Sequence, residues 1–322
     1  MQNKKLLLLS LILAFITACS NNNNNNFSKY KNKLQQQTIK LGYNVEFTNN
    51  IFSKIHFDDS YSFNDQKQFT KKQSFNQYYN NAVNNLRIKK AKNKLQEHHN
   101  LLNNIFTKYQ VQPEYIIALF AIESNFGTKT GDFPVLNSLF NLAYEGRRRK
   151  FFEYEFFAAL KLIKENKLNP NKYEGSWAGA SGQCQFMPST YLKYATDYNL
   201  DGKRDIWHDK EDVFASIANY LHQINWNPNL PFGYEIIASP ELISYSKKIK
   251  NKKISLATLT KKFPINIIQK TKFNQIELTE KVNLITYDGR LFILFNNFHV
   301  IKEWNNSNYF ALTIGLLAEK IK

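Results

Sequence analysis

The chain has 322 residues and a formal net charge of +17, because 43 Lys and Arg residues outnumber 26 Asp and Glu residues. Hydrophobic residues make up 43% of it and aromatic residues 15%, which excludes a disordered or collagen-like polymer and predicts a packed core. The positive charge comes almost entirely from Lys, a pattern typical of AT-biased coding, so we expect no nucleic-acid partner. The two cysteines and six histidines show neither a disulfide framework nor a zinc-binding spacing.

The first residues have the pattern of an export signal. Two lysines precede an apolar run that ends at Ala18, and this run is shorter than the about 20 residues that span a membrane. The sequence Ile16-Thr17-Ala18-Cys19 resembles a bacterial lipobox, which implies cleavage after residue 18 and lipidation of Cys19. An ordinary signal peptide with an incidental cysteine is the alternative. Ser20 favours sorting to the outer membrane of a Gram-negative bacterium, where the protein would face the periplasm.

The remaining chain predicts an α+β protein that is mainly α. Strong helical patterns cover 113–126, 150–167, 188–197 and 211–224, and Asp288-Gly289 predicts a hairpin turn between two strands. We expect a signal peptide at 1–18, a lipidated cysteine and Asn-rich tether at 19–29, a helical N-terminal region at 30–110, a core that carries the chemistry at 111–235, a small β-containing subdomain at 236–302 and a closing helix at 303–322.

Glu123 is the candidate catalytic carboxyl. It stands in the last turn of an otherwise apolar helix, where the helix dipole disfavours a negative charge and neighbouring apolar residues remove water. Both effects raise the pKa of a carboxyl, and a carboxyl that stays protonated near neutral pH can act as a general acid. The alternative is a glutamate that points into solvent from a helix end.

A second candidate region is the glycine-rich stretch 175–190. Its small residues allow a bulky substrate to approach the backbone, and Ser176, Gln183 and Gln185 offer neutral hydrogen-bonding groups suited to sugar hydroxyls and amides. The stretch matches neither a dinucleotide-binding fingerprint nor a phosphate-binding loop. A tight connection without a ligand is the alternative.

Several motifs in order resemble the membrane-bound lytic murein transglycosylase B family. They are Glu123-Ser124-Asn125-Phe126-Gly127, Gly131-Asp132-Phe133, Ala143-Tyr144-Glu145-Gly146-Arg147-Arg148, Ser176–Ser189, Asp205-Ile206-Trp207 and Ala218-Asn219-Tyr220. The resemblance implies a lysozyme-like core, a monomer that acts on peptidoglycan glycan strands, and cleavage of the β-1,4 bond between N-acetylmuramic acid and N-acetylglucosamine. The product it implies has a 1,6-anhydromuramoyl end, and the chemistry requires no cofactor.

The resemblance also implies site residues. It places the single acid/base at Glu123, and substrate-binding residues at Ser176, Gln185, Tyr220 and Asn305. We also expect Trp304, which precedes Asn305, to bind the substrate. Three positions depart from the family pattern. Trp304 and Phe310 stand where the family has tyrosines, and Ser181 stands where it usually has methionine. Loss of the hydroxyl at Phe310 removes one hydrogen bond that the site could make.

A calcium loop is expected after residue 196. The run from Asp197 to Asp205 matches the first nine positions of an EF-hand loop, although the twelfth position is His208 instead of Glu. The family has a longer loop, which implies a structural Ca²⁺ held by Asp197, Asn199, Asp201, the Lys203 carbonyl and Asp212, with Glu211 as the alternative last ligand. A turn without metal remains open.

Arg147, Arg148 and Arg149 are half of the arginines in the chain and precede a helix whose dipole disfavours them. We expect Arg147 and Arg148 to bind carboxylates of the substrate, with a solvated charge run as the alternative.

Two other functions also stay open. A muramidase would use water and needs a second carboxylate, for which Asp132 is the nearby candidate, and a peptidoglycan-binding lipoprotein would lack turnover.

Overall fold

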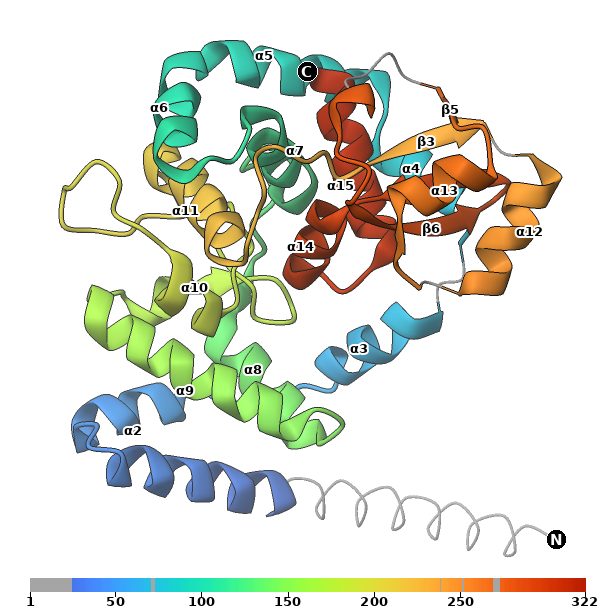
Figure 1. The fold of residues 1–322 in the computed structure, drawn as a ribbon. Helices are drawn as coiled ribbons and strands as arrows, with labels where there is room; N and C mark the ends of the chain where they lie inside the picture. Colours follow the sequence, from blue (N-terminus) through green and yellow to red (C-terminus); the bar gives the residue numbers. More distant parts are fainter. Residues whose placement is uncertain (1–24, 71–72, 238, 251, 269–272) are drawn as a thin grey trace, which may run out of the picture. The chain divides into compact units, whose positions relative to one another are not determined.

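The computed structural model describes residues 25–70, 73–237, 239–250, 252–268 and 273–322 (Figure 1). The predicted signal peptide, Cys19 and the start of the tether lie outside these residues. Within them, no helix is both long and apolar enough to cross a membrane. The chain forms two compact units.

Unit 1 comprises the residues up to Thr70, Gly131–Ser181 and Phe186–Leu192. It is built from helices, and one short antiparallel pair joins β1 to β2. After a helix at 25–40, its elements are α2 (Val45–Ser53), α3 (Ser60–Thr70), β1 (Phe133–Pro134), α8 (Val135–Glu145), α9 (Arg149–Asn166), the 3-10 helix η1 (Pro170–Lys172), β2 (Glu174–Gly175) and most of α10 (Pro188–Tyr194).

Aromatic side chains form the centre of unit 1. The rings of Phe140 and Phe156 meet edge to face at 5.7 Å, so α8 and α9 pack directly against each other. Phe27 adds a third ring, which meets that of Phe140 edge to face at 5.4 Å and is buried. Residues 25–29 therefore belong to a packed helix, which corrects the prediction that the flexible tether extends to residue 29.

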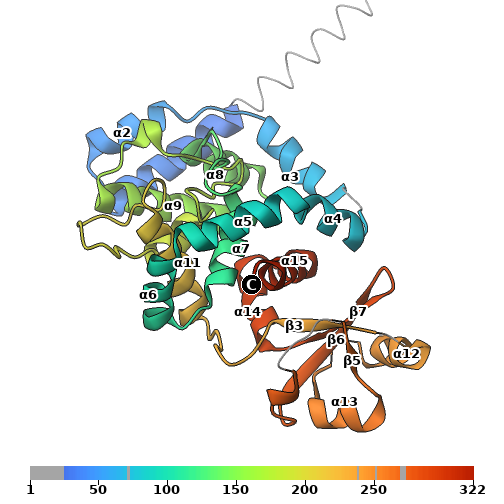
Figure 2. The same ribbon diagram turned by 90° about the horizontal axis from the view of Figure 1, so that it is seen from above.

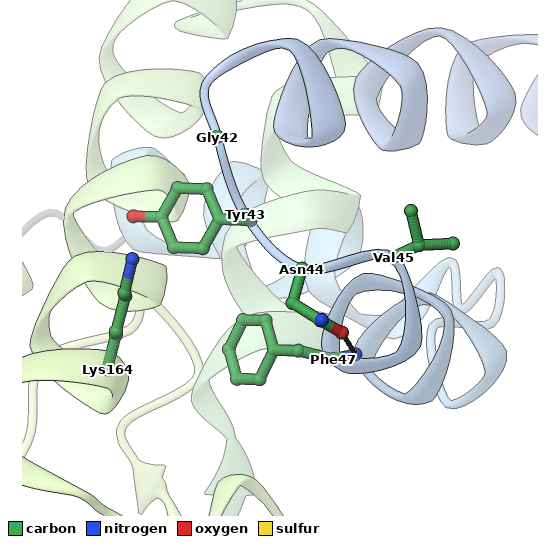
Figure 3. Close-up of a pocket in the computed structure, with 6 residues that line it drawn as sticks. All are labelled: Gly42, Tyr43, Asn44, Val45, Phe47 and Lys164. Carbon is green, nitrogen blue, oxygen red and sulfur yellow. Dashed lines mark hydrogen bonds between the residues drawn. The ribbon is translucent and has the colours of Figure 1, made fainter.

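The turn between the first helix and α2 borders a hollow in unit 1 (Figure 3). The rings of Tyr43 and Phe47 lie nearly parallel, with centroids 6.0 Å apart. The ammonium group of Lys164, on α9, lies 5.3 Å from the centroid of the Tyr43 ring. This cation–π contact attaches the turn to α9.

Unit 2 comprises Lys71–Thr130, Gly182–Gln185 and Lys193–Lys322. Its helices are α4 (Phe75–Ala82), α5 (Asn85–Glu97), α6 (His99–Tyr109), α7 (Pro113–Ser124), α11 (Lys210–Gln223), α12 (Pro240–Ile249), α13 (Leu256–Lys262), α14 (Asn296–Trp304) and α15 (Asn308–Ile321). The strands are β3 (Gly233–Ile237), β4 (Ile254–Ser255), β5 (Asn266–Ile267), β6 (Lys281–Tyr287) and β7 (Arg290–Leu294), with the 3-10 helix η2 (Phe273–Gln275) between β5 and β6.

Helix α7 is the central helix of unit 2, with α5, α6, α11 and α15 packed against it (Figure 1). Every residue from Tyr115 to Ala121 is buried, as expected from a helix that is apolar on all sides. Pro113 occupies the first turn, where a missing backbone N–H leaves no hydrogen bond unmade. The packing fixes the position and direction of Glu123 at the end of this helix.

The sheet of unit 2 is antiparallel, in the order β4-β6-β7-β3-β5, and α12 and α13 lie beside it (Figure 2). The hairpin between β6 and β7 turns at Asp288 and Gly289, whose φ angles of 49° and 79° match the turn that this residue pair favours. Ser307 caps α15 by accepting a hydrogen bond from the backbone N–H of Phe310. The predicted hairpin and closing helix are both confirmed.

The predicted class, α+β and mainly α, is also confirmed. The helical stretches expected at 113–126, 150–167, 188–197 and 211–224 appear as α7, α9, α10 and α11. Helix α7 ends earlier than expected, because Asn125 and Phe126 adopt left-handed backbone conformations. The two compact units cut across the predicted segments 30–110 and 111–235, each of which contributes to both units.

Candidate functional site

Glu123 lies in the last turn of α7, at the point where the chain leaves the helix. The three residues Asn125, Phe126 and Gly127 have φ angles of 48°, 62° and 80°, so the backbone turns sharply after the carboxyl. A Cβ atom on Gly127 would lie 2.4 Å from the Oε1 atom of Gln183, which leaves room for glycine alone. Glu123 is half-buried and keeps some contact with solvent.

Burial raises the pKa of Glu123 to about 8, and a hydrogen bond from the Trp304 side chain opposes this shift. The indole N–H can only donate, so it stabilises the ionised form of the carboxyl. At neutral pH the carboxyl of Glu123 is therefore mostly protonated. This is the protonation state that a general acid needs, and it agrees with the prediction made from the apolar helix.

Trp304 reaches Glu123 from the end of α14 and is itself held by Tyr220. The two rings meet edge to face, with centroids 4.7 Å apart. The Tyr220 hydroxyl donates a 2.8 Å hydrogen bond to the carbonyl of Glu303, the residue before Trp304. The ring of Tyr194 contacts that of Tyr220, and their centroids lie 4.6 Å apart. The predicted site residues Tyr220 and Trp304 thus lie together beside the carboxyl.

Asn305 follows Trp304 and is exposed in the loop between α14 and α15. Its backbone carbonyl accepts a 2.6 Å hydrogen bond from the backbone N–H of Ser307. Phe310, which stands where the family has a tyrosine, is buried in α15. Asn305 is therefore exposed to solvent, whereas Phe310 contributes to the packing of unit 2.

Gln185 is fixed in an unusual conformation. Its φ is 51°, and its side-chain Nε2 atom donates hydrogen bonds of 2.9 Å to the carbonyls of Thr130 and Gly182. Its Oε1 atom remains an acceptor for an amide or hydroxyl of a ligand. The adjacent Cys184 is fully buried, and burial, followed by the charge of Glu123, raises the pKa of its thiol well above the ordinary value. A thiolate nucleophile at Cys184 is thus disfavoured.

Gln183 proves to be structural, which corrects its interpretation as a sugar-binding group. Its side chain donates to the carbonyl of Trp207 and accepts a 2.8 Å hydrogen bond from the ammonium of Lys210. Both atoms of its amide are therefore occupied within unit 2. The buried side chain thus connects the glycine-rich stretch to the start of α11.

Tyr78, on α4, is a candidate site residue that the sequence analysis missed. Its hydroxyl is sensitive to Glu123: burial raises the pKa of Tyr78, and the negative charge of Glu123 raises it further. The ring also contacts that of Tyr309, with centroids 5.9 Å apart. In the sequence, Tyr78 is one more aromatic residue in a polar helical region, and nothing local connects it to the carboxyl.

Ser176 belongs to unit 1, directly after β2. Its hydroxyl oxygen accepts a 3.1 Å hydrogen bond from the backbone N–H of Ala180, while its backbone N–H donates to the Ala180 carbonyl at 2.7 Å. The side chain is half-buried, so its hydroxyl proton can be donated to a ligand. Ser181, the third departure from the family pattern, is fully buried next to the hydroxyl of Tyr173.

The three arginines of unit 1 have different surroundings. Arg147 forms a bidentate ion pair with Asp65, with two N–H···O distances of 2.6 Å. Arg149 donates to the carbonyls of Ala143 and Tyr144 at the end of α8. Arg148 is exposed, and no carboxylate of the described residues lies within ion-pair distance of it. Arg147 and Arg149 therefore contribute to the structure of unit 1, whereas the exposed guanidinium of Arg148 lies 4.1 Å from the centroid of the Phe151 ring.

The predicted calcium loop folds around its own side chains. The backbone N–H of Asp201 donates to Oδ1 of both Asp197 and Asn199, at 3.1 and 3.0 Å, which brings these oxygens together. Asp212 is buried at the start of α11 and accepts from the amides of Tyr198 and Asp205, both at 2.7 Å. In the part of the chain that the structure describes, no three His, Cys, Asp or Glu side chains form a metal-binding group.

The chemistry of these donors nevertheless suits calcium. Asp197, Asn199, Asp201 and the Lys203 carbonyl all offer oxygen, which is the ligand atom that Ca²⁺ prefers. A carboxylate oxygen that accepts one hydrogen bond still has a lone pair for a metal. The close oxygens are those of residues 197 to 201, and Asp212 fixes the two ends of the loop through its amide contacts.

Comparisons with known proteins agree with this geometry. The family model for the transglycosylase SLT domain matches residues 26–319. Membrane-bound lytic murein transglycosylase B of Escherichia coli (strain K12) is 26% identical over 239 residues, which cover 70% of this chain and 61% of that relative. The chain thus spans less than two thirds of the length of this curated relative.

Solved structures share the fold. SltB3 from Pseudomonas aeruginosa, in complex with NAG-NAM-pentapeptide, is 29% identical and superimposes with a TM-score of 0.84, covering 92% of this chain and 79% of its own. The Escherichia coli lytic transglycosylase SLT35 in complex with calcium shares the fold, at 22% identity and a TM-score of 0.77, with 92% of each chain covered. With its family model matched over nearly the whole chain, this protein belongs to the transglycosylase SLT domain family.

Proposed function

We propose that the chain is a lytic transglycosylase that cleaves the β-1,4 bond between N-acetylmuramic acid and N-acetylglucosamine in peptidoglycan. The observation that carries the proposal is the carboxyl of Glu123, whose pKa burial raises to about 8. Its position at the end of a helix buried on all sides keeps it in one place. Membership of the transglycosylase SLT domain family supports the same reaction class.

In the first step, the protonated Glu123 gives its proton to the glycosidic oxygen. The bond between C1 of the muramic acid and that oxygen breaks, and the N-acetylglucosamine side leaves with a hydroxyl. Glu123 is then a carboxylate and takes the proton of the C6 hydroxyl of the same muramic acid. The C6 oxygen bonds to C1, which closes the 1,6-anhydro ring and consumes no water. A pKa near neutrality suits a group that both donates and accepts the proton.

The surroundings of Glu123 favour this route over hydrolysis. Burial and the Trp304 hydrogen bond account for the direction of its pKa shift, and no second carboxylate contributes to it. An inverting or retaining glycosidase usually pairs its acid with a second carboxylate that activates water or acts as a nucleophile. An intramolecular C6 hydroxyl is already held near C1 and needs neither. We therefore favour the transglycosylase over the muramidase.

The other site residues are proposed to bind the glycan. Gln185 has a free acceptor oxygen and Asn305 an exposed amide, which suit the N-acetyl and hydroxyl groups of the sugars. Tyr220 and Trp304 offer aromatic surface beside the acid. In unit 1, the hydroxyl of Ser176 suits a hydrogen bond to a sugar hydroxyl. The exposed guanidinium of Arg148 suits a carboxylate of the stem peptide.

A peptidoglycan-binding protein without turnover is the second candidate, because two aromatic positions of the family pattern have changed to Trp304 and Phe310. The hydrogen bond from Trp304 to Glu123 argues against this candidate, since the substituted residue still addresses the acid. Turnover of purified sacculi distinguishes the two. We expect the wild type to release soluble muropeptides and Glu123→Gln to release none, while Glu46→Gln, an exposed glutamate on α2, retains wild-type activity. Binding without release by the wild type would favour the second candidate.

We also propose that the mature chain is attached to the outer membrane through a lipid on Cys19. The lipobox-like sequence supports this, as does similarity to a relative described as membrane-bound. Fractionation of cells that carry the full chain tests it. The wild type should be found with outer membranes, and Cys19→Ala should be found in the soluble periplasmic fraction. Equal distribution of the two proteins would contradict the lipid anchor.

A structural calcium ion is proposed for the loop after α10. The ligands would be Asp197, Asn199, Asp201 and the Lys203 carbonyl, with Asp212 closing the loop. The bound ion would hold the loop that precedes α11, the helix that carries Tyr220. Its role is thus to stabilise the site, and no chemical step passes through it.

A further inference from the structure

A large cavity lies in unit 2 at the start of α7. Its volume is about 980 Å³, and apolar side chains form much of its wall, among them Phe106, Leu230, Tyr234 and Ile276. Glu114, in the first turn of α7, also lines it. Glu123 is nine positions beyond Glu114, so at 1.5 Å per residue the cavity opens about 14 Å along the helix from the catalytic carboxyl. It is therefore a second feature, distinct from the proposed active site.

Glu319 gives this cavity an unpaired carboxyl. The residue is half-buried on α15, and it makes no hydrogen bond or ion pair with any residue that the structure describes. Burial raises its pKa, the nearby charge of Lys322 lowers it, and the charge of Glu114 raises it again. Partial burial takes some water away from this carboxyl, and a cationic ligand in the cavity can replace the lost solvation.

Tyr115 adds a second, independent polar group. Its side chain is 3% exposed and lines the same cavity. Its oxygen accepts a 3.3 Å hydrogen bond from the backbone N–H of Phe232, and no acceptor for its own proton occurs among the described residues. After burial, the charge of Glu319 is the next cause that raises the pKa of the Tyr115 hydroxyl, which places the two groups close together.

The combination of walls and charges selects one kind of ligand. Among the charged side chains of the wall, the two carboxylates of Glu114 and Glu319 outnumber the one ammonium group, that of Lys322, so the wall disfavours an anion. A neutral apolar ligand would cover the Glu319 carboxylate without giving it a hydrogen-bond partner. A cation on a flexible apolar stem satisfies both parts of the wall. The stem can lie against Phe106, Leu230 and Tyr234 while the charged end meets the carboxylates.

We propose that this cavity binds a primary alkylammonium group carried by a peptide, such as a lysine side chain or the free amine of a diamino acid. The ammonium group donates hydrogen bonds to the carboxylates of Glu319 and Glu114. The Tyr115 hydroxyl is placed to bond a carbonyl of the peptide that carries the amine. The site recruits a peptide to unit 2 and takes no part in the bond cleavage at Glu123.

A ligand titration, monitored by NMR of the protein's methyl groups, tests this site directly. The probe is Nα-acetyl-lysine methylamide, whose side-chain amine is free. Its control is Nα-acetyl-norleucine methylamide, which has an apolar side chain of similar length without the amine. We expect saturable shifts at Leu230 and Ile276 with the lysine probe, and binding about tenfold weaker or more with norleucine. Shifts of equal size with both compounds, or no saturation with either, would overturn the proposal.

Variants then assign the charge. Glu319→Gln keeps the shape of the side chain and should weaken lysine binding about tenfold, and Glu114→Gln should weaken it by a smaller factor. Glu241→Gln, an exposed glutamate on α12 outside the cavity, is the matched control and should bind like the wild type. A melting curve verifies that each variant is folded. Unchanged binding in both cavity variants would contradict an ammonium site.

The same titration distinguishes two sources of the amine. A peptidoglycan stem peptide with a free diamino-acid amine is compared with its N-acetylated form. Binding that N-acetylation abolishes supports a cell-wall amine as the ligand. Binding of the lysine probe without binding of the stem peptide supports a lysine of a protein partner.

Discussion

The side chain of Trp304 donates a hydrogen bond to the carboxyl of Glu123, and this contact opposes the effect of burial on the acid. Burial keeps the proton on the carboxyl, whereas the indole stabilises the ionised form. The balance leaves the pKa of Glu123 at about 8, where the group can give up a proton and take one back. The aromatic residue that departs from the family pattern thus contributes to the acid's strength.

Trp304→Phe should move the alkaline limb of the pH profile of kcat/KM to higher pH. The substitution removes a donor to the ionised carboxyl, so the pKa of Glu123 rises above about 8, by about half a unit or more. The control is Tyr220→Phe, which loses a hydrogen bond to the Glu303 carbonyl but no donor to Glu123. Its limb should move less. An unchanged limb in Trp304→Phe would show that the indole does not set the pKa of the acid.

Glu123→Gln should be more stable than the wild type at alkaline pH. The folded pKa of Glu123, about 8, exceeds its ordinary value of 4.5, so the neutral carboxyl favours folding below pH 4.5 and this contribution is lost as the pH rises through 8. Glutamine cannot ionise. The free energy of unfolding of the variant should therefore exceed that of the wild type by about 2 kcal/mol at pH 9, allowing for partial exposure of the side chain.

Denaturant unfolding at pH 5 and pH 9 measures this difference. The gap between the two proteins should grow with pH and level off above the pKa of Glu123. A gap that is the same at both values would mean that the folded protein leaves the pKa of the carboxyl near its ordinary range.

Arg147→Ala and Arg148→Ala should have different effects. Arg147→Ala breaks the bidentate pair with Asp65 and should lower the free energy of unfolding by about 0.5 to 1 kcal/mol, an effect that salt reduces. Asp65→Asn should lower it similarly. Arg148→Ala should raise KM for peptide-bearing glycans more than Arg147→Ala does. It should lower the free energy of unfolding less than Arg147→Ala does. Equal changes in KM for both arginine variants would contradict the assignment of Arg147 to structure.

Calcium should raise the melting temperature of the wild type, because an ion bound only by the folded state stabilises it by mass action. Asp201→Ala removes a ligand from the loop and should abolish the increase. Asp59→Ala, which removes an exposed carboxylate outside the loop, should retain it. Identical melting curves of the wild type in calcium and in chelator would rule out the metal site.

Much of the fold could be predicted from local patterns. The apolar run around Tyr115 predicts a buried helix, and Asp288-Gly289 predicts a hairpin, because each depends on residues that are neighbours in the sequence. Residues 25–29 were misjudged because an asparagine run hides the one apolar residue, Phe27, that packs into unit 1. Each of the two units is assembled from segments that are distant in the sequence, and no single stretch of sequence encodes such a division.

The site could be predicted in part. Glu123 stands out locally, since one helix both places and desolvates it. The roles of Tyr78, Gln183 and Arg147 depend on partners distant in the sequence, and side-chain chemistry alone does not show whether a polar group is already bonded. Gln183 and Arg147 have partners within the protein. Tyr78 lies near Glu123 because α4 packs against α15.

The mass of the glycan ends released from purified sacculi tests the central proposal most directly. With the soluble form that lacks residues 1–24, the proposed intramolecular step at Glu123 predicts muropeptides lighter by one water than hydrolysis products, with no reducing end on the muramic acid. Borohydride should leave these products unreduced. Predominantly reducing muramoyl ends would contradict the account and assign the protein to the hydrolytic muramidases.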